Sequence, residues 1–362
     1  MPLPSRDRLR DMLVAEWRHL SAFQRSDRVW QMPLAAALAS GAPLMIGAWV
    51  GRMDYGLISS LGGIVFLYVQ DTPLSHRMVT LMTCAFGLAG SYALGMISHF
   101  FPLLMVPALT FIAILVTMVV RLFRLPPPGS VFFIMAASIG MYATGDPLEI
   151  PLKVGLLTMG ALLACLIAFF YSLYVLRLQP ARPAEPPPPP TFDFVVYDSI
   201  LIGVFVGASM AIAQALQVER VYWAPVSCAA VIQGASLRAV WNRQVHRIVG
   251  TCVGLLLAWA LLLLPLDAWS ISFVMMALAF ATESLVVRHY GLAAVFITPM
   301  AIFLAEAASL GHGSPTTLIA ARFLDTVLGC GVGLVGGACI HNARLRETLG
   351  GHMRRLASAR LS

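Results

Sequence analysis

Arg322 and Asp325 are charged residues in the stretch ARFLDTVLG, which belongs to a long apolar run. A spacing of three places both side chains on one face of a helix. A charge inside a membrane costs about 2.5–3.5 kcal/mol on insertion scales, so such residues face the protein interior and usually pair. Either the two residues form a mutual salt bridge that locks the helix, or Arg322 contacts the carboxylate of a bound anion while Asp325 orients it or carries a proton.

Glu283 is a second charged residue in apolar surroundings, within ALAFATESLVVRH. At 1.5 Å per residue, it lies about 7 Å along a helix from Arg288. A carboxylate held inside a membrane is a candidate proton carrier, and the alternative is a pairing with Arg288 or His289. Asp198 and Glu306 lie nearer to the ends of apolar runs, so we interpret both as solvated boundary residues.

Motifs for other reaction chemistries are absent from the sequence. It has no glycine loop with lysine and Ser/Thr that would bind ATP phosphates, no metal-binding motif and no GxSxG. The six cysteines lie inside apolar stretches, without the paired spacing of a metal site or a disulfide framework, and are Cys84, Cys165, Cys228, Cys252, Cys330 and Cys339. We therefore expect that the chain is not an enzyme and has no cofactor and no metal site.

The composition indicates a membrane protein. Of the 362 residues, 59% are hydrophobic and only 11% are charged, whereas a soluble domain carries about 25% charged residues. Apolar stretches of about 20 residues, the length that crosses a bilayer core, fill most of the chain. The first 30 residues are charged throughout and lack the apolar core of a secretory signal, so we expect a cytoplasmic or interfacial helix there.

We predict about twelve membrane-spanning helices, and therefore an all-α integral membrane fold. In the first half the predicted spans are 32–50, 55–70, 79–98, 101–120, 129–145 and 152–176. In the second half they are 195–216, 221–234, 247–264, 268–287, 291–309 and 319–341. The ranges 55–70 and 221–234 are short for a crossing, which suggests tilted or partly re-entrant helices.

Positive charges are distributed unevenly between the predicted loops. The net charge is +7, from 24 Lys and Arg against 17 Asp and Glu. Alternate loops place 20 of the 24 cations on one side of the membrane and leave four on the other, which are Arg52, Lys153, Arg220 and Arg322. Cytoplasmic loops retain positive charge, so we predict that both termini are cytoplasmic. The loops account for the basic charge, and no nucleic-acid partner is expected.

The chain partly repeats on either side of the polyproline stretch RPAEPPPPPT, residues 182–191. An offset of 169 aligns the last span of each half and pairs Lys153 with Arg322, Leu156 with Asp325, and Gly160 with Gly329. Six spans per half predict two parallel six-helix repeats about an axis along the membrane normal. The predicted divisions are an N-terminal segment 1–30, a first repeat 31–177, a Pro-rich cytoplasmic linker 178–193, a second repeat 194–342 and a basic cytoplasmic tail 343–362.

The tetrapeptides HRMV and HRIV occupy matching places and put Arg77 and Arg247 at the head of apolar runs. We interpret both arginines as anchors that reach phosphate headgroups, and the alternative is that Arg247 steers an anionic substrate at the inner mouth. Small residues at a spacing of four let another helix approach closely. The glycines expected to pack helices in this way are Gly250, Gly254, Gly329, Gly333 and Gly337.

The stretches VYWAPVSCAAVIQ and RQVHRIVGTCVG resemble the fusaric acid resistance or aromatic acid exporter family. Members typically show a Tyr-Trp-Ala stretch opening a short span and an Arg-Ile-x-Gly-Thr-x-x-Gly entry to the next. The matching residues here are Tyr222, Trp223, Ala224, Arg247, Ile248, Gly250, Thr251 and Gly254. The closing stretch ARFLDTVLG is also similar to the family's final span, and the match is stronger in the second half than in the first.

The resemblance implies a multi-pass component of the bacterial inner membrane that exports aromatic or other organic acids, with a periplasmic adaptor protein and an outer-membrane channel. We expect Arg322 to attract the substrate carboxylate, and Tyr222 and Trp223 to stack on its ring. Asp325 or Glu283 would carry the proton if a proton gradient, rather than the membrane potential, drives export.

Two other functions fit the same sequence. The chain could be a passive organic-anion channel, which would survive neutralisation of Glu283 and Asp325, or a non-transporting membrane subunit of an efflux assembly. A membrane enzyme would need a polar cluster at one interface, and the sequence shows none beyond isolated His and Asp. The sequence leaves homo-oligomer formation open.

Overall fold

The computed structural model describes residues 22–26, 28–143, 145–182, 191–306 and 315–358. Every regular element in these ranges is a helix and none is a strand, which confirms the all-α prediction for the described chain. The helix expected within residues 1–30 and the polyproline stretch lie largely outside the described residues.

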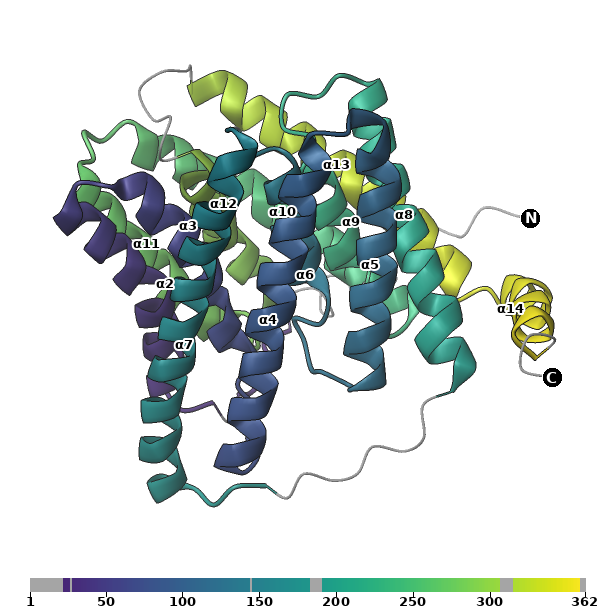
Figure 1. Cartoon of the computed structure of the whole chain (residues 1–362), viewed down its shortest axis with the longest axis horizontal. Helices are drawn as coiled ribbons and strands as arrows, with labels where there is room; N and C mark the ends of the chain where they lie inside the picture. The colour runs from purple at the N-terminus through teal and green to yellow at the C-terminus, as the bar shows by residue number, and fades with distance from the viewer. Residues whose placement is uncertain (1–21, 27, 144, 183–190, 307–314, 359–362) are drawn as a thin grey trace, which may run out of the picture.

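Twelve helices, α2 to α13, follow the predicted spans in order, and α14 comes after them (Figure 1). Those of the first half are α2 (Gln31–Val50), α3 (Met53–Gly63), α4 (Leu74–His99), α5 (Met105–Leu122), α6 (Val131–Met141) and α7 (Ile150–Leu178). Those of the second half are α8 (Asp198–Ala215), α9 (Trp223–Ile232), α10 (Leu237–Leu262), α11 (Ala268–Leu285), α12 (Tyr290–Glu306) and α13 (Pro315–Ile340). The last helix is α14 (Ala343–Ser358).

Length separates two kinds of helix within this order. Eight segments of the described chain are long and apolar enough to cross a membrane, and they contain α2, α4, α5, α7, α8, α10, α11 and α13. The apolar helices at α3, α6, α9 and α12 have 10–17 residues, fewer than any of these eight segments. Length therefore supports eight crossings, and the count of twelve stays a prediction.

Helix α10 begins ten residues before the predicted span, at Leu237 rather than residue 247. The side chain of Ser236 caps it, because its Oγ accepts a hydrogen bond from the backbone N–H of Ala239 at 3.2 Å. Two arginines in these first turns, Arg238 and Arg243, give the segment the appearance of a loop in the sequence. The consequence is that Arg247 lies inside a helix and not at its head.

Helix pairs that pack together in the first half have counterparts in the second (Figure 1). Helix α4 packs on α6 and α7, and α10 packs on α12 and α13. Helix α7 also packs on α3, and α13 packs on α9. The halves meet along two seams, where α5 lies against α8 and α2 lies against α11; we call these the α5–α8 seam and the α2–α11 seam.

The last helix of each half approaches its short neighbour at backbone distance. A methyl group at Gly160 of α7 would collide with the carbonyl oxygen of Ser59 in α3, and one at Gly329 of α13 would collide with that of Ala224 in α9. A glycine is needed at both places because a Cβ atom has no room there.

Candidate functional site

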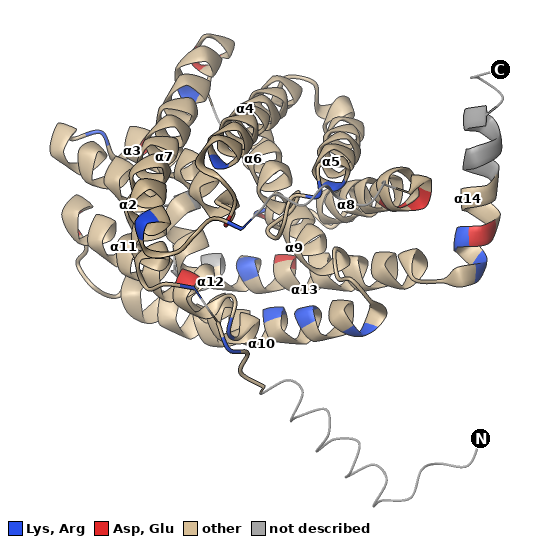
Figure 2. Cartoon of the chain, turned by 90° about the horizontal axis from the view of Figure 1, so that it is seen from below, with Lys and Arg blue, Asp and Glu red and all other residues tan. Residues whose placement is uncertain are grey.

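The site is built where α9, α10, α12 and α13 meet. Figure 2 shows charged segments on the neighbouring helices α10 and α13, although most of the helical surface is uncharged. Trp223 is the first residue of α9, and its side chain is buried. The guanidinium carbon of Arg322, two turns into α13, lies 3.8 Å from the centre of the Trp223 ring. This cation–π contact holds a buried cation without neutralising it.

Arg247 supplies a second buried guanidinium from the middle of α10, where it is only 7% exposed. Its Nη1 donates to the hydroxyl of Tyr290 on α12 at 3.2 Å, and its Nη2 donates to the hydroxyl of Ser227 on α9 at 3.4 Å. Its Nε is buried and has no hydrogen-bond partner among the described residues. The prediction that Arg247 reaches lipid headgroups is therefore wrong, because the longer α10 carries it inside the protein.

Asp325 lies one turn beyond Arg322 and is fully buried. Neither of its carboxylate oxygens has a hydrogen-bond partner among the described residues, and the same holds for Nε and Nη1 of Arg322. No ion pair within 4.0 Å joins these two described residues. The mutual salt bridge is therefore excluded, since the guanidinium lies over Trp223 instead.

Aromatic rings extend the site toward the first half. The ring of Tyr222 lies 5.2 Å from that of Trp223 and 6.0 Å from that of Tyr142, which follows α6. The Tyr142 hydroxyl accepts a hydrogen bond from Nε2 of Gln214 at 2.9 Å. The structure thus brings together Arg322, Tyr222, Trp223, Arg247 and Asp325, which come from three separate stretches of the sequence.

Two contributors to this site were missed in the sequence: Ser227 and Tyr142. Ser227 follows Trp223 by four residues, so helical spacing places both on one face of α9. Tyr142 has no such signal, because its partner, Tyr222, is distant in sequence.

Glu283 of α11 does not belong to this cluster. Its carboxylate forms an ion pair with Arg28, at 3.3 Å, in the segment that precedes α2. The predicted pairing with Arg288 or His289 is wrong, because Arg288 and His289 follow the end of α11 while Arg28 comes from a part of the chain that folds back onto this helix.

The predicted packing glycines all lie against a neighbouring helix. A Cβ atom on Gly254 would come within 2.6 Å of the Val295 carbonyl oxygen on α12, and Gly250 faces Gly291 and Ala294 on the same helix. On α13, Gly329 and Gly333 face α9, and Gly337 faces Val240 of α10. These close approaches fix α13 against α9 and α10, and so position Arg322 and Asp325.

The matching cations of the first half have partners in the protein. Lys153, the counterpart of Arg322, pairs with Glu149 at 2.9 Å. Arg77 is buried, with its Nε donating to the carbonyl oxygen of Thr72 at 2.6 Å and its Nη1 to Ser172 Oγ at 3.4 Å. The headgroup-anchor prediction for Arg77 is therefore also wrong, because protein groups surround its guanidinium.

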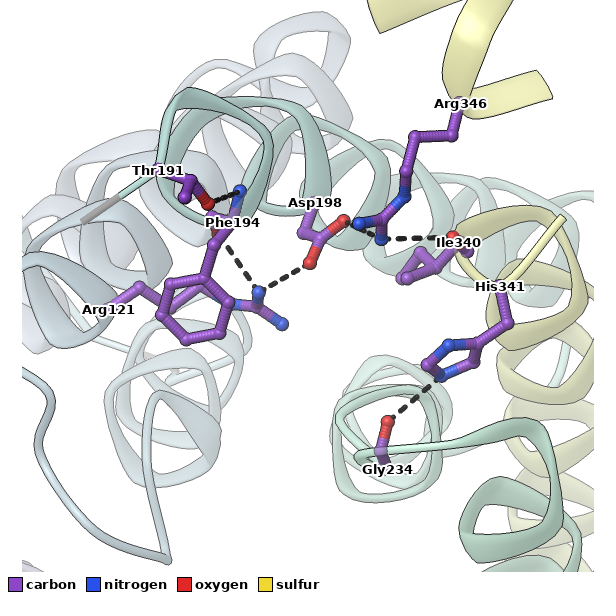
Figure 3. Close-up of polar contacts among 8 residues, drawn as sticks. All are labelled: Arg121, Thr191, Phe194, Asp198, Gly234, Ile340, His341 and Arg346. Atoms are coloured by element: carbon purple, nitrogen blue, oxygen red, sulfur yellow. Dashed lines mark hydrogen bonds and ion pairs between the residues drawn. The ribbon is translucent and has the colours of Figure 1, made fainter. Parts of the chain in front are cut away.

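Asp198 anchors a separate polar cluster at the start of α8 (Figure 3). Its two carboxylate oxygens accept from Arg121 of α5 at 2.7 Å and from Arg346 of α14 at 2.9 Å. Its side chain is only 7% exposed. The prediction of a solvated boundary residue is wrong, because α5 and α14 cover it with two cations.

Comparisons with known proteins agree with the resemblance seen in the sequence. Residues 206–336 match the family model described as fusaric acid resistance protein-like, and this range contains Trp223, Arg247, Arg322 and Asp325. The chain is 22% identical over 454 aligned positions to the uncharacterized membrane protein YvaC of Bacillus subtilis strain 168, a match that covers 85% of this chain and 72% of the relative. No solved structure matches the chain. The resemblance is therefore confirmed, and this multi-pass membrane protein is similar to the fusaric acid resistance proteins over residues 206–336.

Proposed function

We propose that the chain is a secondary transporter of the bacterial inner membrane that exports organic anions, in particular aromatic carboxylic acids of the fusaric acid kind. The observation that carries this proposal is the pair of buried guanidinium groups, Arg322 and Arg247, whose Nε atoms have no hydrogen-bond partner among the described residues. The cluster therefore holds two buried cations and one buried carboxylate, Asp325. One bound carboxylate would neutralise the cluster and accept the unused N–H groups.

The aromatic surroundings favour a ring on the bound anion. Tyr222 lies beside Trp223, whose face is occupied by Arg322, and Tyr142 lies beside Tyr222. A flat aromatic acid can place its carboxylate against the guanidinium groups and its ring against these side chains by offset stacking. We therefore propose Arg322, Arg247, Tyr222 and Trp223 as the substrate-binding residues.

A proton gradient or the membrane potential would drive export. Asp325 is the first choice as proton carrier, because its carboxylate is buried within the anion site. Glu283 is the second choice, because it pairs with Arg28 and is not one of the residues of the anion site. Neutralising Asp325 would abolish proton-coupled transport, whereas a passive channel would keep its anion flux after the same change.

We further propose two parallel six-helix repeats that cross the membrane twelve times, with both termini in the cytoplasm. The recurrence of helix pairs in the two halves supports the repeat. The four short helices also fall at matching places, α3 with α9 and α6 with α12. Tilt, or burial against longer neighbours, would let these short helices contribute to the membrane domain.

The proposed partners are the bilayer, the organic anion, a periplasmic adaptor protein and an outer-membrane channel. We propose neither an enzymatic reaction nor a nucleic-acid partner, and a homo-oligomer is compatible with the proposal. An adaptor with one N-terminal span encoded beside this chain would support the efflux assembly.

Growth of a deletion strain on a panel of aromatic acids tests the function. The strain is restored with the wild-type chain, with Arg322→Ala or with the matched control Lys153→Ala, and membrane levels of each chain are compared. We expect the wild type and Lys153→Ala to restore tolerance of at least one acid, and Arg322→Ala to fail at equal expression. Equal sensitivity of the deletion strain and all restored strains would contradict the exporter function.

A further inference from the structure

The two seams between the halves have apolar cores of different size. In the cluster that contains the α5–α8 seam, α5 and α8 contribute eight buried residues, which are Met105, Leu109, Ile112, Ala113, Ile202, Val206, Met210 and Ala213. In the corresponding cluster of the described chain, α2 and α11 contribute four buried residues, which are Leu44, Ile271, Met275 and Leu278. The α2–α11 seam therefore has less buried apolar surface to hold it closed.

Ion pairs of opposite polarity close the same end of both seams. At the α5–α8 seam, α5 carries the cation Arg121 and α8 carries the anion Asp198 (Figure 3). At the α2–α11 seam, α11 carries the anion Glu283, and the cation Arg28 precedes α2. Both pairs lie where α5 and α11 end and where α8 and α2 begin.

The two ion pairs differ in how firmly they are held. Asp198 binds Arg121 and Arg346 at 2.7 and 2.9 Å, and Arg121 also donates to the Phe194 carbonyl oxygen at 2.9 Å. Among the described residues Glu283 pairs with one cation, Arg28, at the longer distance of 3.3 Å. A single pair with a half-exposed partner is weak, whereas breaking a buried network leaves charges without partners.

Backbone contact also differs between the seams. A Cβ atom at Gly203 of α8 would meet the backbone of α5 at Ile114 N, 2.9 Å away. At Gly41 of α2 the three nearest atoms all belong to the side chain of Met276 on α11. A methionine side chain can change rotamer, so α2 and α11 can separate without breaking a backbone fit.

We propose that the α2–α11 seam opens and closes while the α5–α8 seam stays closed, and that the Arg28–Glu283 ion pair is the latch of the opening seam. Opening separates α2 from α11 at the end that Arg28 covers. The α5–α8 seam, held by Asp198 and its two arginines, then serves as the fixed joint between the halves.

The latch is connected to the anion site through the start of α12. The ring of Phe23 lies 5.2 Å from that of His289, and the backbone N–H of Gln24 donates to the Arg288 carbonyl oxygen at 2.9 Å. Tyr290, the residue after His289, accepts a hydrogen bond from Arg247. Release of the segment that carries Arg28 therefore loosens the residue that orients the Arg247 guanidinium. This consequence rests on the proposed function, whereas the opening of the seam does not.

Cysteine accessibility tests the seam without any transport measurement. Thr282 and Ser199 are matched reporters, since each is buried, has a hydroxyl without a hydrogen-bond partner among the described residues, and adjoins the anion of its seam, Glu283 or Asp198. In a chain whose six native cysteines are alanine, Thr282→Cys or Ser199→Cys is introduced. The reagent is a sulfonated methanethiosulfonate, applied to the protein in lipid nanodiscs.

We expect the cysteine at 282 to react about tenfold faster than that at 199, because the open fraction of its seam is larger. Adding Arg28→Gln should raise the rate at 282 several-fold further and leave that at 199 unchanged. Equal rates at the two positions, a faster reaction at 199, or no response to Arg28→Gln would each overturn the proposal. These reaction rates test the opening of the α2–α11 seam whether or not the chain transports an anion.

Disulfide locks test the consequence for transport. A Cβ atom at Gly41 would lie 3.3 Å from that of Met276 across the opening seam, and one at Gly207 would lie 3.1 Å from that of Thr110 across the fixed seam. Cysteine pairs at these positions are oxidised in proteoliposomes loaded with radiolabelled benzoate. We expect the oxidised 41–276 pair to lose transport and recover it on reduction, and the 207–110 pair to transport in both states.

Two outcomes of the lock experiment have separate meanings. Full transport by the oxidised 41–276 pair would overturn the moving seam while leaving the exporter function intact. Absence of transport in the wild type with every aromatic acid tried would count against the proposed function alone, since the cysteine rates judge the seam independently.

Discussion

The last helices of the two halves, α7 and α13, share their packing but differ in their chemistry. Both press a glycine, Gly160 or Gly329, against the backbone of a short neighbouring helix. Lys153 on α7 has a carboxylate partner one turn away, whereas Arg322 on α13 lies over an indole ring and leaves two nitrogens without hydrogen bonds among the described residues. The small residues can thus keep the same helix packing in both halves. Of these two matched cations, only Arg322, in the second half, is buried without an ion-pair partner among the described residues.

The largest expected difference concerns the two matched arginines of α10 and α4. Arg247→Gln should lower the initial rate of anion transport about 100-fold, because losing one partner of a buried charge pair costs about 2–5 kcal/mol. Arg77→Gln should leave the rate per folded molecule nearly unchanged, since its guanidinium is used by Thr72 and Ser172. Initial rates in proteoliposomes, normalised to folded protein, make the comparison. Equal losses of rate would mean that Arg77 contributes to transport as much as Arg247, which would contradict the proposed difference between the halves.

Leu156 of α7 and Asp325 of α13 are matching positions that differ in charge. Adding a carboxylate at position 156 should lower stability, whereas removing the carboxylate at position 325 should not. Leu156→Asp places a new carboxylate in the membrane domain and should cost about 2.5–3.5 kcal/mol on insertion scales. Asp325→Leu removes a buried carboxylate that has no hydrogen-bond partner among the described residues, so stability should be unchanged or higher while transport is lost. Unfolding in mixed detergent, followed by tryptophan fluorescence, gives both values. Destabilisation by Asp325→Leu would show that the carboxylate is structural.

The shared packing predicts a symmetric effect of smaller size. Gly160→Ala and Gly329→Ala should each destabilise the protein by about 1–3 kcal/mol, because the new methyl group meets backbone atoms. Gly155→Ala and Gly331→Ala are the controls on the same helices, since a Cβ at either would meet nothing within 4 Å. The same unfolding measurement applies, and a loss confined to one half would contradict the common framework.

The smallest effect is expected at the hydroxyl that orients Arg247. Tyr290→Phe removes one acceptor and should cost about 1 kcal/mol, seen as a roughly fivefold higher KM for the transported acid. Tyr55→Phe is the control, because Tyr55 stacks on Arg52, which is not among the residues of the anion site. A fall in maximal rate without a change in KM would place Tyr290 in the conformational cycle instead of in binding.

The sequence predicts the order of the helices well because long apolar runs have few alternatives in a membrane. It fails at the start of α10, where Arg238 and Arg243 make a helical segment look like a loop. It also cannot tell which short helices cross the bilayer, since a 10-residue helix such as α9 is defined by its buried neighbours and not by its own length.

Within the site, the divergence between the halves was enough to select Asp325, whose counterpart is Leu156, because a charged residue in only one copy cannot serve the shared fold. Arg322 was selected with it because a spacing of three places both on one helix face. The partners of Glu283 and Asp198 were not predictable in the same way. Arg28 is 255 residues away from Glu283, and Arg346 is 148 residues away from Asp198. Pairing at such separations follows from tertiary packing, which helical spacing does not encode.

The contact between Arg346 and Asp198 has a consequence for synthesis of the chain. When α8 leaves the ribosome, Asp198 can pair with Arg121, but its second cation has not yet been translated. The joint between the halves is therefore completed only once the segment after α13 has emerged. A chain cut short by premature termination before Arg346 would leave Oδ1 of this buried carboxylate without its hydrogen-bond donor, which gives membrane quality control a defect to recognise.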